Sequence, residues 1–136
     1  MSENQYDPKM LSPLDLAFVG DGVYGLLVRE HIARQGSRPV GEMHRLAVGY
    51  VNASSQAAAY QAISPELSEE EQAIFRRGRN GGAHPPRNAN PGDYAKATGL
   101  EALFGYLYLV GRRERITELF SFILSKTAFD AGGAHE

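Results

Sequence analysis

The spacing of apolar residues predicts a series of helices and no β-strand. Apolar positions recur three and four residues apart along most of the chain, and no segment sustains the two-residue alternation of a half-buried strand. Ser12-Pro13 is a typical helix start, Gly36 a typical helix end, and Ser68 with Glu71 a capping box. The predicted helices cover residues 13–36, 41–63, 68–77, about 93–111 and roughly 114–129.

One segment interrupts this pattern. Residues 78–92 contain four glycines and three prolines, which are too many helix breakers for a helix, so we predict a long loop there. Loops of this length inside a compact domain are usually functional or disordered. We therefore expect a single all-α domain over residues 1–136, a helical bundle with its core at about 12–129 between a loose lead-in and a frayed tail.

Length and composition agree with one globular domain and exclude several classes of protein. The 136 residues suffice for a hydrophobic core, and contents of 43% hydrophobic and 22% charged residues are ordinary. Without cysteine, the chain forms neither a disulfide nor a thiolate zinc site. The polar, acidic N-terminus is unlike a secretory signal, and the longest apolar run is too short to cross a bilayer. We expect a cytoplasmic protein.

Charge is distributed unevenly along the chain. The net charge of −2 does not indicate a dedicated nucleic-acid binder. Residues 75–90, however, contain Arg76, Arg77, Arg79 and Arg87 and no acidic residue. This region is therefore expected to form a local basic patch on a weakly acidic protein.

Asp21 is a single carboxylate within an apolar helix. Residues three and four positions apart share a helix face, and the face of Asp21 is otherwise formed by Leu14, Ala17, Phe18, Tyr24 and Val28. We therefore expect this face to be buried and Asp21 to point inward. A buried charge is costly unless it is paired, hydrogen-bonded or bound to a metal ion.

Glu101 repeats this feature in the predicted fourth helix. It shares a face with Ala97, Phe104, Gly105 and Tyr108. Gly20 and Gly22, on either side of Asp21, predict a close approach of the backbone to another element, because each glycine costs about 1 kcal/mol in a helix interior.

Residue spacing leaves two interpretations of these acids open. In the first, each acid is structural and is bonded to a buried arginine such as Arg29, to a tyrosine or to the backbone. In the second, the two acids meet around a cation, because like charges brought together need one. Oxygen ligands in a chain without cysteine favour a hard ion, magnesium or manganese.

Both acidic segments resemble motifs of one enzyme family. The stretch LAFVGDGVYGLLVREHI is similar to the signature helix of the ribonuclease III family, and ATGLEALFGYLYL is similar to its second motif. HRLAVGYVNASSQA and FRRGRN resemble segments of the Mini-ribonuclease III branch, which consists of the catalytic domain without a double-stranded-RNA-binding domain. Together the four segments extend the resemblance over most of residues 12–125.

The resemblance implies an all-helical, homodimeric endonuclease that cuts double-stranded RNA with magnesium, for which manganese substitutes, and leaves a 5′-phosphate. Carried over residue by residue, it assigns Asp21 and Glu101 as the catalytic, metal-binding carboxylates. Two further acids of the family motifs are Ala17 and Thr98 here, a reduced set that the small branch generally shares. In that branch the usual substrate is precursor 23S ribosomal RNA, often presented with a ribosomal protein.

The resemblance also implies an RNA-binding role for the basic segment, because a catalytic domain without an RNA-binding domain must make its own phosphate contacts. Arginine and amide side chains suit the phosphates and 2′-hydroxyls of A-form RNA. The candidates are Arg76, Arg77, Arg79, Asn80 and Arg87. The alternative is a solvated, charged loop, and the roles of His44, Arg45 and Lys96 stay open.

Two other functions compete with the endoribonuclease. One is a catalytically silent ribonuclease III-like domain that serves as an RNA-binding or ribosome-assembly module, and the other is a helical interaction protein unrelated to RNA. The presence of both Asp21 and Glu101 favours the enzyme, because a silent relative loses such acids without penalty.

Overall fold

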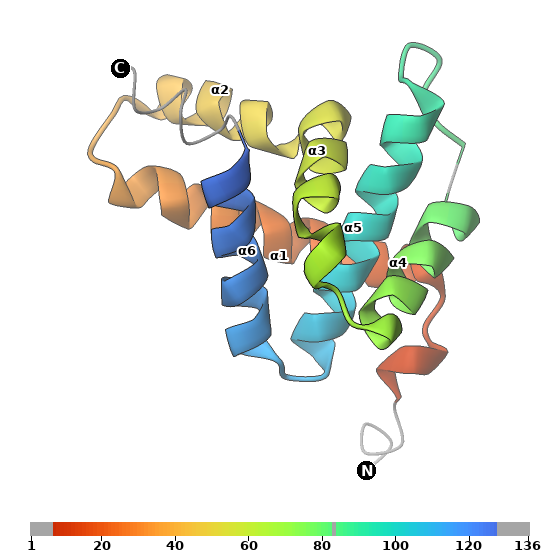
Figure 1. The fold of residues 1–136 in the computed structure, drawn as a ribbon. Helices are drawn as coiled ribbons and strands as arrows, with labels where there is room; N and C mark the ends of the chain where they lie inside the picture. Colours follow the sequence, from red (N-terminus) through yellow and green to blue (C-terminus); the bar gives the residue numbers. More distant parts are fainter. Residues whose placement is uncertain (1–6, 83, 128–136) are drawn as a thin grey trace.

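Two long helices, α1 (Pro13–Arg34) and α5 (Pro91–Leu109), cross at the centre of the fold (Figure 1). The computed structural model describes residues 7–82 and 84–127. The other elements pack against one or both of these helices or against each other. They are α2 (Val40–Val51), α3 (Ala53–Ile63), α4 (Glu69–Gly81) and α6 (Arg113–Lys126), with the 3-10 turns η2 (Pro8–Met10) and η3 (Ser64–Glu66). Within the described residues there is no strand, which confirms the predicted all-α fold.

Side-chain caps start three of the helices, and two of these caps, at Ser12 and Ser68, are the ones that the sequence predicted. The hydroxyl of Ser12 accepts a hydrogen bond of 3.1 Å from the amide of Asp15 at the start of α1. Ser68 and Glu71 form the predicted capping box of α4, with bonds of 2.9 and 3.1 Å. Asn90 caps α5 in the same way. Each cap satisfies an amide that has no partner inside its helix.

The predicted helix over 41–63 is wrong in one respect, because the chain breaks it at Asn52 into α2 and α3. Asn52 has an extended backbone (φ −72°, ψ 161°), and its side-chain oxygen accepts a bond of 2.8 Å from the amide of Ser55. Its amide group donates to the carbonyl of Val48, at the end of α2. One side chain therefore caps two helix ends, which hydrophobic spacing does not reveal.

The predicted loop is also shorter than expected, because α4 continues through Gly78 to Gly81. A Cβ on Gly78 would lie 2.7 Å from the Cβ of Ala102 and 2.9 Å from the Cα of Gly99, so this glycine allows α4 to pack closely on α5. Glycine serves here as a helix-packing residue and not as a helix breaker.

The two ends of the chain differ in part from the expectation. The predicted loose lead-in contains η2, which Asp7 caps through a bond of 3.0 Å from the amide of Lys9. The last helix ends at Lys126, and residue 129, where we predicted its end, lies outside the described residues.

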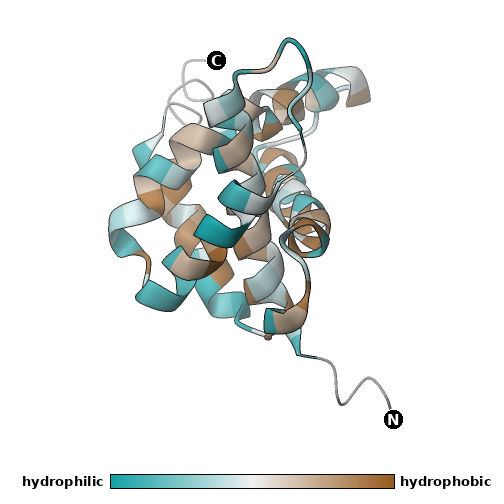
Figure 2. Ribbon diagram, turned by 90° about the vertical axis from the view of Figure 1, so that its right-hand side faces the viewer, coloured by the Kyte–Doolittle hydropathy of each residue, from teal (hydrophilic) through white to brown (hydrophobic). Residues whose placement is uncertain are grey.

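Buried side chains from α1 to α6 form one hydrophobic core. Tyr24 of α1 packs edge-on against Phe104 and Phe120, with ring centroids 5.4 and 5.7 Å apart. Figure 2 shows apolar residues where the helices face one another and hydrophilic residues on the outer surfaces. None of the described helices is both long enough and apolar enough to span a membrane.

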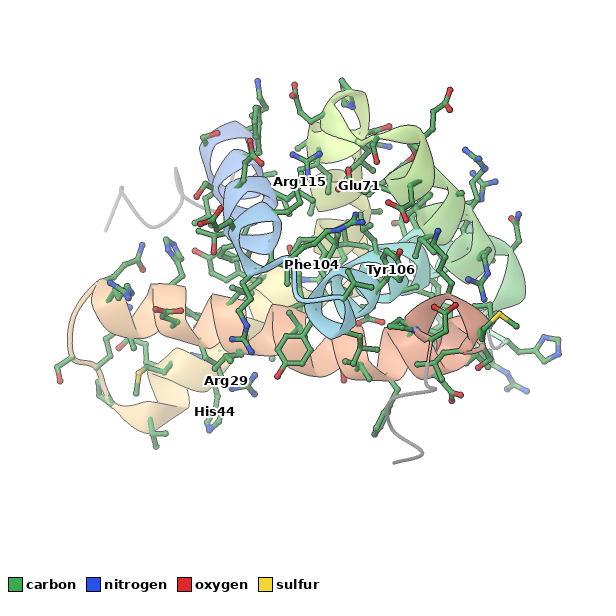
Figure 3. The ribbon with its side chains drawn as sticks, turned by 90° about the horizontal axis from the view of Figure 1, so that it is seen from below. Arg29, His44, Glu71, Phe104, Tyr106 and Arg115 are labelled. Carbon is green, nitrogen blue, oxygen red and sulfur yellow. The ribbon has the colours of Figure 1, made fainter. Side chains whose placement is uncertain are left out.

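An ion pair joins α6 to α4. Arg115 donates hydrogen bonds of 2.9 and 2.8 Å to the two carboxylate oxygens of Glu71, which is 3% exposed (Figure 3). The same arginine donates to the carbonyl of Glu66 at 2.7 Å. Because Glu71 also belongs to the capping box, this contact anchors the start of α6 to the start of α4.

Candidate active site

The backbones of α1 and α5 touch where the helices cross. A Cβ on Gly20 would overlap the carbonyl oxygen of Glu101, and a Cβ on Gly105 would overlap the main chain of α1. Glycine at these positions lets the helices approach this closely, as the sequence predicted for Gly20. For Gly22 the prediction is wrong, because a Cβ there would meet no neighbouring element within 4 Å. Asp21 directly follows Gly20, so the crossing brings its carboxylate to Glu101.

The carboxyl groups of Asp21 and Glu101 interact with each other. The pKa of Glu101 is raised from 4.5 to about 7, first by burial and then by the negative charge of Asp21 and a hydrogen bond between the two carboxyl groups. A hydrogen bond from Gln56 opposes this rise. The two acids thus meet, which residue spacing alone left open, and like charges in contact favour a shared proton or a cation.

Asp21 does not point into the core, contrary to the prediction. It is exposed, and Leu14 and Phe18 of the same predicted face are 45% and 82% exposed. The buried side of α1 consists of Leu16, Ala17, Gly20, Tyr24, Gly25, Val28 and Ile32. Helical spacing could not identify this side, because α1 carries apolar residues on nearly all of its faces. Glu101 is partly buried, so the pair lies at the edge of the core.

Gln56 is a residue of this site that sequence reasoning missed. It lies on α3, is 3% exposed, and its Nε2 donates a hydrogen bond of 3.3 Å to Oε2 of Glu101. The signal available in the sequence was a long polar side chain among the small residues of ASSQAAA. That signal does not identify the partner, which is 45 residues away along the chain.

The chemistry of the acid pair fits a magnesium ion. Neither Asp21 nor Glu101 forms a salt bridge with another described residue. No group of three or more His, Cys, Asp and Glu side chains converges in the described part of the chain. Magnesium is commonly held by one or two carboxylates, with water and substrate phosphate completing its ligands. Asp21 and Glu101 are the residues that would hold it.

The predicted RNA-binding arginines separate into two groups on α4. Arg76 and Arg79 are exposed, and their spacing places them on one face together with Asn80, which accepts a bond of 3.1 Å from Arg79. Arg77 faces the N-terminal segment, where it donates bonds of 3.1 and 2.7 Å to the carbonyls of Lys9 and Leu11. An RNA contact of Arg77 stays a prediction, but its guanidinium already holds η2 against the fold.

The remaining basic candidates lie on other elements. Arg87 is exposed in the segment between α4 and α5, and Lys96 is partly buried on α5. Arg45 is exposed on α2. His44 lies beside Arg29 in Figure 3, and both line an apolar pocket of about 260 Å³ between α1 and α2.

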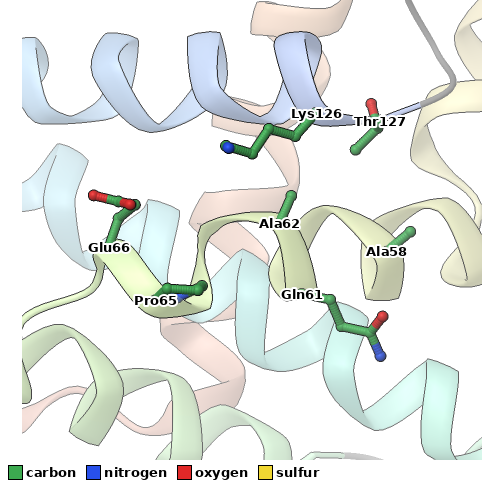
Figure 4. Close-up of a pocket in the computed structure, with 7 residues that line it drawn as sticks. All are labelled: Ala58, Gln61, Ala62, Pro65, Glu66, Lys126 and Thr127. Carbon is green, nitrogen blue, oxygen red and sulfur yellow. The ribbon is translucent and has the colours of Figure 1, made fainter.

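A second pocket lies between α3, η3 and the end of α6 (Figure 4). Its volume is about 660 Å³, and its charged lining residues are Glu66 and Lys126. Neither of these two pockets is lined by Asp21 or Glu101, so the acid pair is not part of either pocket.

Comparison with known proteins identifies the family to which this arrangement belongs. Residues 14–112, which include both acids, Gln56 and the basic candidates, match the family model of the ribonuclease III domain. The chain belongs to the ribonuclease III family. The acid pair therefore lies within a ribonuclease III domain, in agreement with the resemblance of the two separate motifs.

Individual relatives agree with this assignment. A protein of Symbiobacterium thermophilum named Mini-ribonuclease 3 is 46% identical over 83% of this chain and 88% of its own length. A Mini-ribonuclease 3 of Enterococcus faecalis is 39% identical over 88% of this chain and 93% of its own. A crystal structure of a Fusobacterium nucleatum protein superposes with a TM-score of 0.78 at 30% identity, over 85% of this chain and 93% of that one. The family and these names support an endoribonuclease of the ribonuclease III type.

Proposed function

We propose that the protein cleaves double-stranded or structured RNA by magnesium-dependent hydrolysis, with Asp21 and Glu101 as its catalytic carboxylates. One observation carries the proposal. The two acids meet at the glycine crossing of α1 and α5, inside the segment that matches the ribonuclease III domain. The product expected from the family resemblance carries a 5′-phosphate and a 3′-hydroxyl.

The two acids have different tasks because their surroundings differ. Magnesium, when bound, supplies a water of lowered pKa and positive charge for the departing oxygen, and manganese is expected to substitute for it. Asp21 is exposed, so a cation that it holds would be accessible to a substrate phosphate. Glu101 is partly buried, and it has to lose its proton before it binds a cation.

The exposed basic residues supply the proposed RNA contacts. The exposure of Arg76 and Arg79 on α4 and of Arg87 beyond it supports phosphate contacts from these arginines. Asn80 is exposed as well, and its amide suits phosphates or 2′-hydroxyls. Such contacts read the shape of an A-form duplex and carry no base information. We therefore expect binding that depends on RNA structure more than on sequence.

A homodimer fits both the substrate and the surface of α1. Three exposed apolar residues lie on one side of this helix, because Phe18 follows Leu14 by four residues and Leu26 follows Phe18 by eight. An exposed apolar stripe of this kind marks an interaction surface. A symmetric dimer would present one carboxylate pair to each strand of a duplex, with cuts offset by a short 3′ overhang.

The biological substrate follows from the resemblance. Precursor 23S ribosomal RNA, presented with a ribosomal protein in the cytoplasm, is the substrate that we propose. Mapping of ribosomal RNA ends in cells that lack the protein tests this point, and accumulation of an unprocessed precursor is the expected result. Normal 23S ends would contradict the substrate but not the cleavage chemistry.

Incubation of the purified protein with a long RNA duplex tests the activity itself. We expect cleavage with magnesium and none with a chelator. Binding without cleavage would favour the catalytically silent RNA-binding or ribosome-assembly module. Neither binding nor cleavage would favour an interaction protein unrelated to RNA.

A further inference from the structure

Gln56 brings a buried amide to the edge of the carboxylate pair. Its side chain comes from α3, a helix that packs against α5, and donates through Nε2 to Oε2 of Glu101 at 3.3 Å. The amide presents its NH2 group to Glu101, which is the donor that the carboxylate accepts once it is ionised.

Packing alone does not account for an amide at this position. The other buried residues of α3 are Ala57, Ala59 and Ile63, which are apolar. Burial of a polar group is unfavourable unless the group is hydrogen-bonded, and an apolar side chain would fill the same space without that requirement. The hydrogen bond to Glu101 explains why a glutamine occupies this buried position.

The junction between α2 and α3 directs Gln56 towards Glu101. Asn52 caps the start of α3 four residues before Gln56, and the hydroxyl of Ser55 donates a bond of 2.6 Å to the carbonyl of Gly49. These bonds set where α3 begins and how it leaves α2. Gln56 then lies in the first turns of α3, on the side that packs against α5.

We propose that Gln56 is a positioning residue that holds the carboxylate of Glu101 in the orientation required for a divalent cation. The carboxylate has about four acceptor positions on its two oxygens, so one bond at Oε2 leaves others for the cation. The inference rests on the proposed function, because Gln56 acts only through Glu101. Loss of such a supporting partner typically lowers metal affinity or activity about 10–100-fold.

The test is the Gln56→Met variant, which keeps the length of the side chain and removes the donor. Manganese binding without RNA is measured by the loss of the free-ion signal in electron paramagnetic resonance. We expect the dissociation constant to rise about 10-fold or more, with a matching rise in the magnesium concentration for half-maximal cleavage. If the folded variant binds manganese with native affinity, the proposal is wrong.

Two glutamines provide matched controls. Gln61→Met changes an exposed residue of the same helix and should leave manganese affinity unchanged. Gln72→Met removes hydrogen bonds to Tyr60 and Ser64, so it should lower stability and still bind manganese normally. If Gln72→Met weakened manganese binding as much as Gln56→Met, the effect would follow from lost stability and the proposal would fall.

A second variant and a catalytic variant separate the possible failures. If Gln56→Met does not fold, Gln56→Asn keeps the amide but is one methylene shorter, and native manganese affinity in that variant would equally overturn the proposal. An inactive Asp21→Asn together with a native-like Gln56→Met would reject only the positioning role. An Asp21→Asn variant that cleaved duplex RNA normally would reject the proposed function, and the role of Gln56 with it.

Discussion

Gly20 lies against the carbonyl group of Glu101, so a backbone contact between α1 and α5 places the two acids of the candidate site side by side. The contact leaves no room for even one methyl group. The position of Asp21 relative to Glu101 therefore depends on a residue that has no side chain.

Replacement of Gly20 by alanine should separate the helices and destabilise the protein. The added Cβ meets main-chain atoms, which yield less easily than side chains, so we expect a loss of about 3 kcal/mol or more in the free energy of unfolding. Urea denaturation measures this loss. The control is Gly49→Ala, an exposed site in α2 with open space around its Cβ position, where a gain of up to about 1 kcal/mol is expected. Equal effects of the two changes would contradict the packing role of Gly20.

Asp21→Asn should reduce duplex cleavage in magnesium to background while the fold and RNA binding stay intact. The amide has nearly the same volume as the carboxylate but lacks the charge that attracts a cation. Single-turnover cleavage and circular dichroism measure the two properties. Asp15→Asn on the same helix, also exposed, should cleave normally. Native-like cleavage rates for Asp21→Asn would contradict the assignment of Asp21 as a catalytic carboxylate.

Glu101 should make the stability of the metal-free protein depend on pH between about 4.5 and 7. Because its pKa is raised to about 7 in the folded state, the folded protein holds this proton more tightly than the unfolded chain does. Stability is therefore full below pH 4.5 and falls as pH rises through about 7, by on the order of 3 kcal/mol in total at about 1.4 kcal/mol per pKa unit.

Comparison of the native protein with Glu101→Gln isolates the contribution of Glu101 from that of the other titratable groups. Denaturation at pH 5 and pH 8 should show the fall in the native protein and a much smaller fall in the variant. Glu70 does not interfere, because hydrogen bonds from Tyr106, Arg112 and Lys9 lower its pKa to about 2. The same pH dependence in both proteins would show that Glu101 is not the group responsible.

Substitution of Arg76 and Arg79 by alanine should weaken binding to all RNA duplexes about equally. Each lost phosphate contact should flatten the slope of log affinity against log salt by roughly one unit. Arg77→Ala should instead lower thermal stability, because its guanidinium holds the carbonyls of Lys9 and Leu11. An unchanged salt slope in the double variant would mean that this face of α4 points away from RNA.

Phe18→Ser should convert the proposed dimer into a monomer. The side chain is 82% exposed, so its loss creates no cavity in the chain itself, and the stability of the monomer should change little. Sedimentation equilibrium at micromolar concentration measures the mass. A native protein that sediments at 14.9 kDa throughout this range would contradict the dimer.

Local signals in the sequence predicted the starts of α1 and α4 and drew attention to the two acids. The hydroxyls of Ser12 and Ser68 act on amides three residues away, so their effect is local and can be recognised in the sequence. Asp21 and Glu101 were recognisable for a similar reason. Each is a carboxylate among small and apolar residues at helical spacing, and this pattern lies within a single helix.

Helix packing in three dimensions sets which side of α1 is buried and which residue of α3 contacts Glu101. α1 is apolar on most of its surface, so packing against α5 selected the side of Gly20 and left Phe18 and Asp21 exposed. Gln56 reaches Glu101 across 45 residues of sequence, because α3 packs against α5. Such contacts depend on how helices pack in space, and the spacing of residues within one helix carries no information about them.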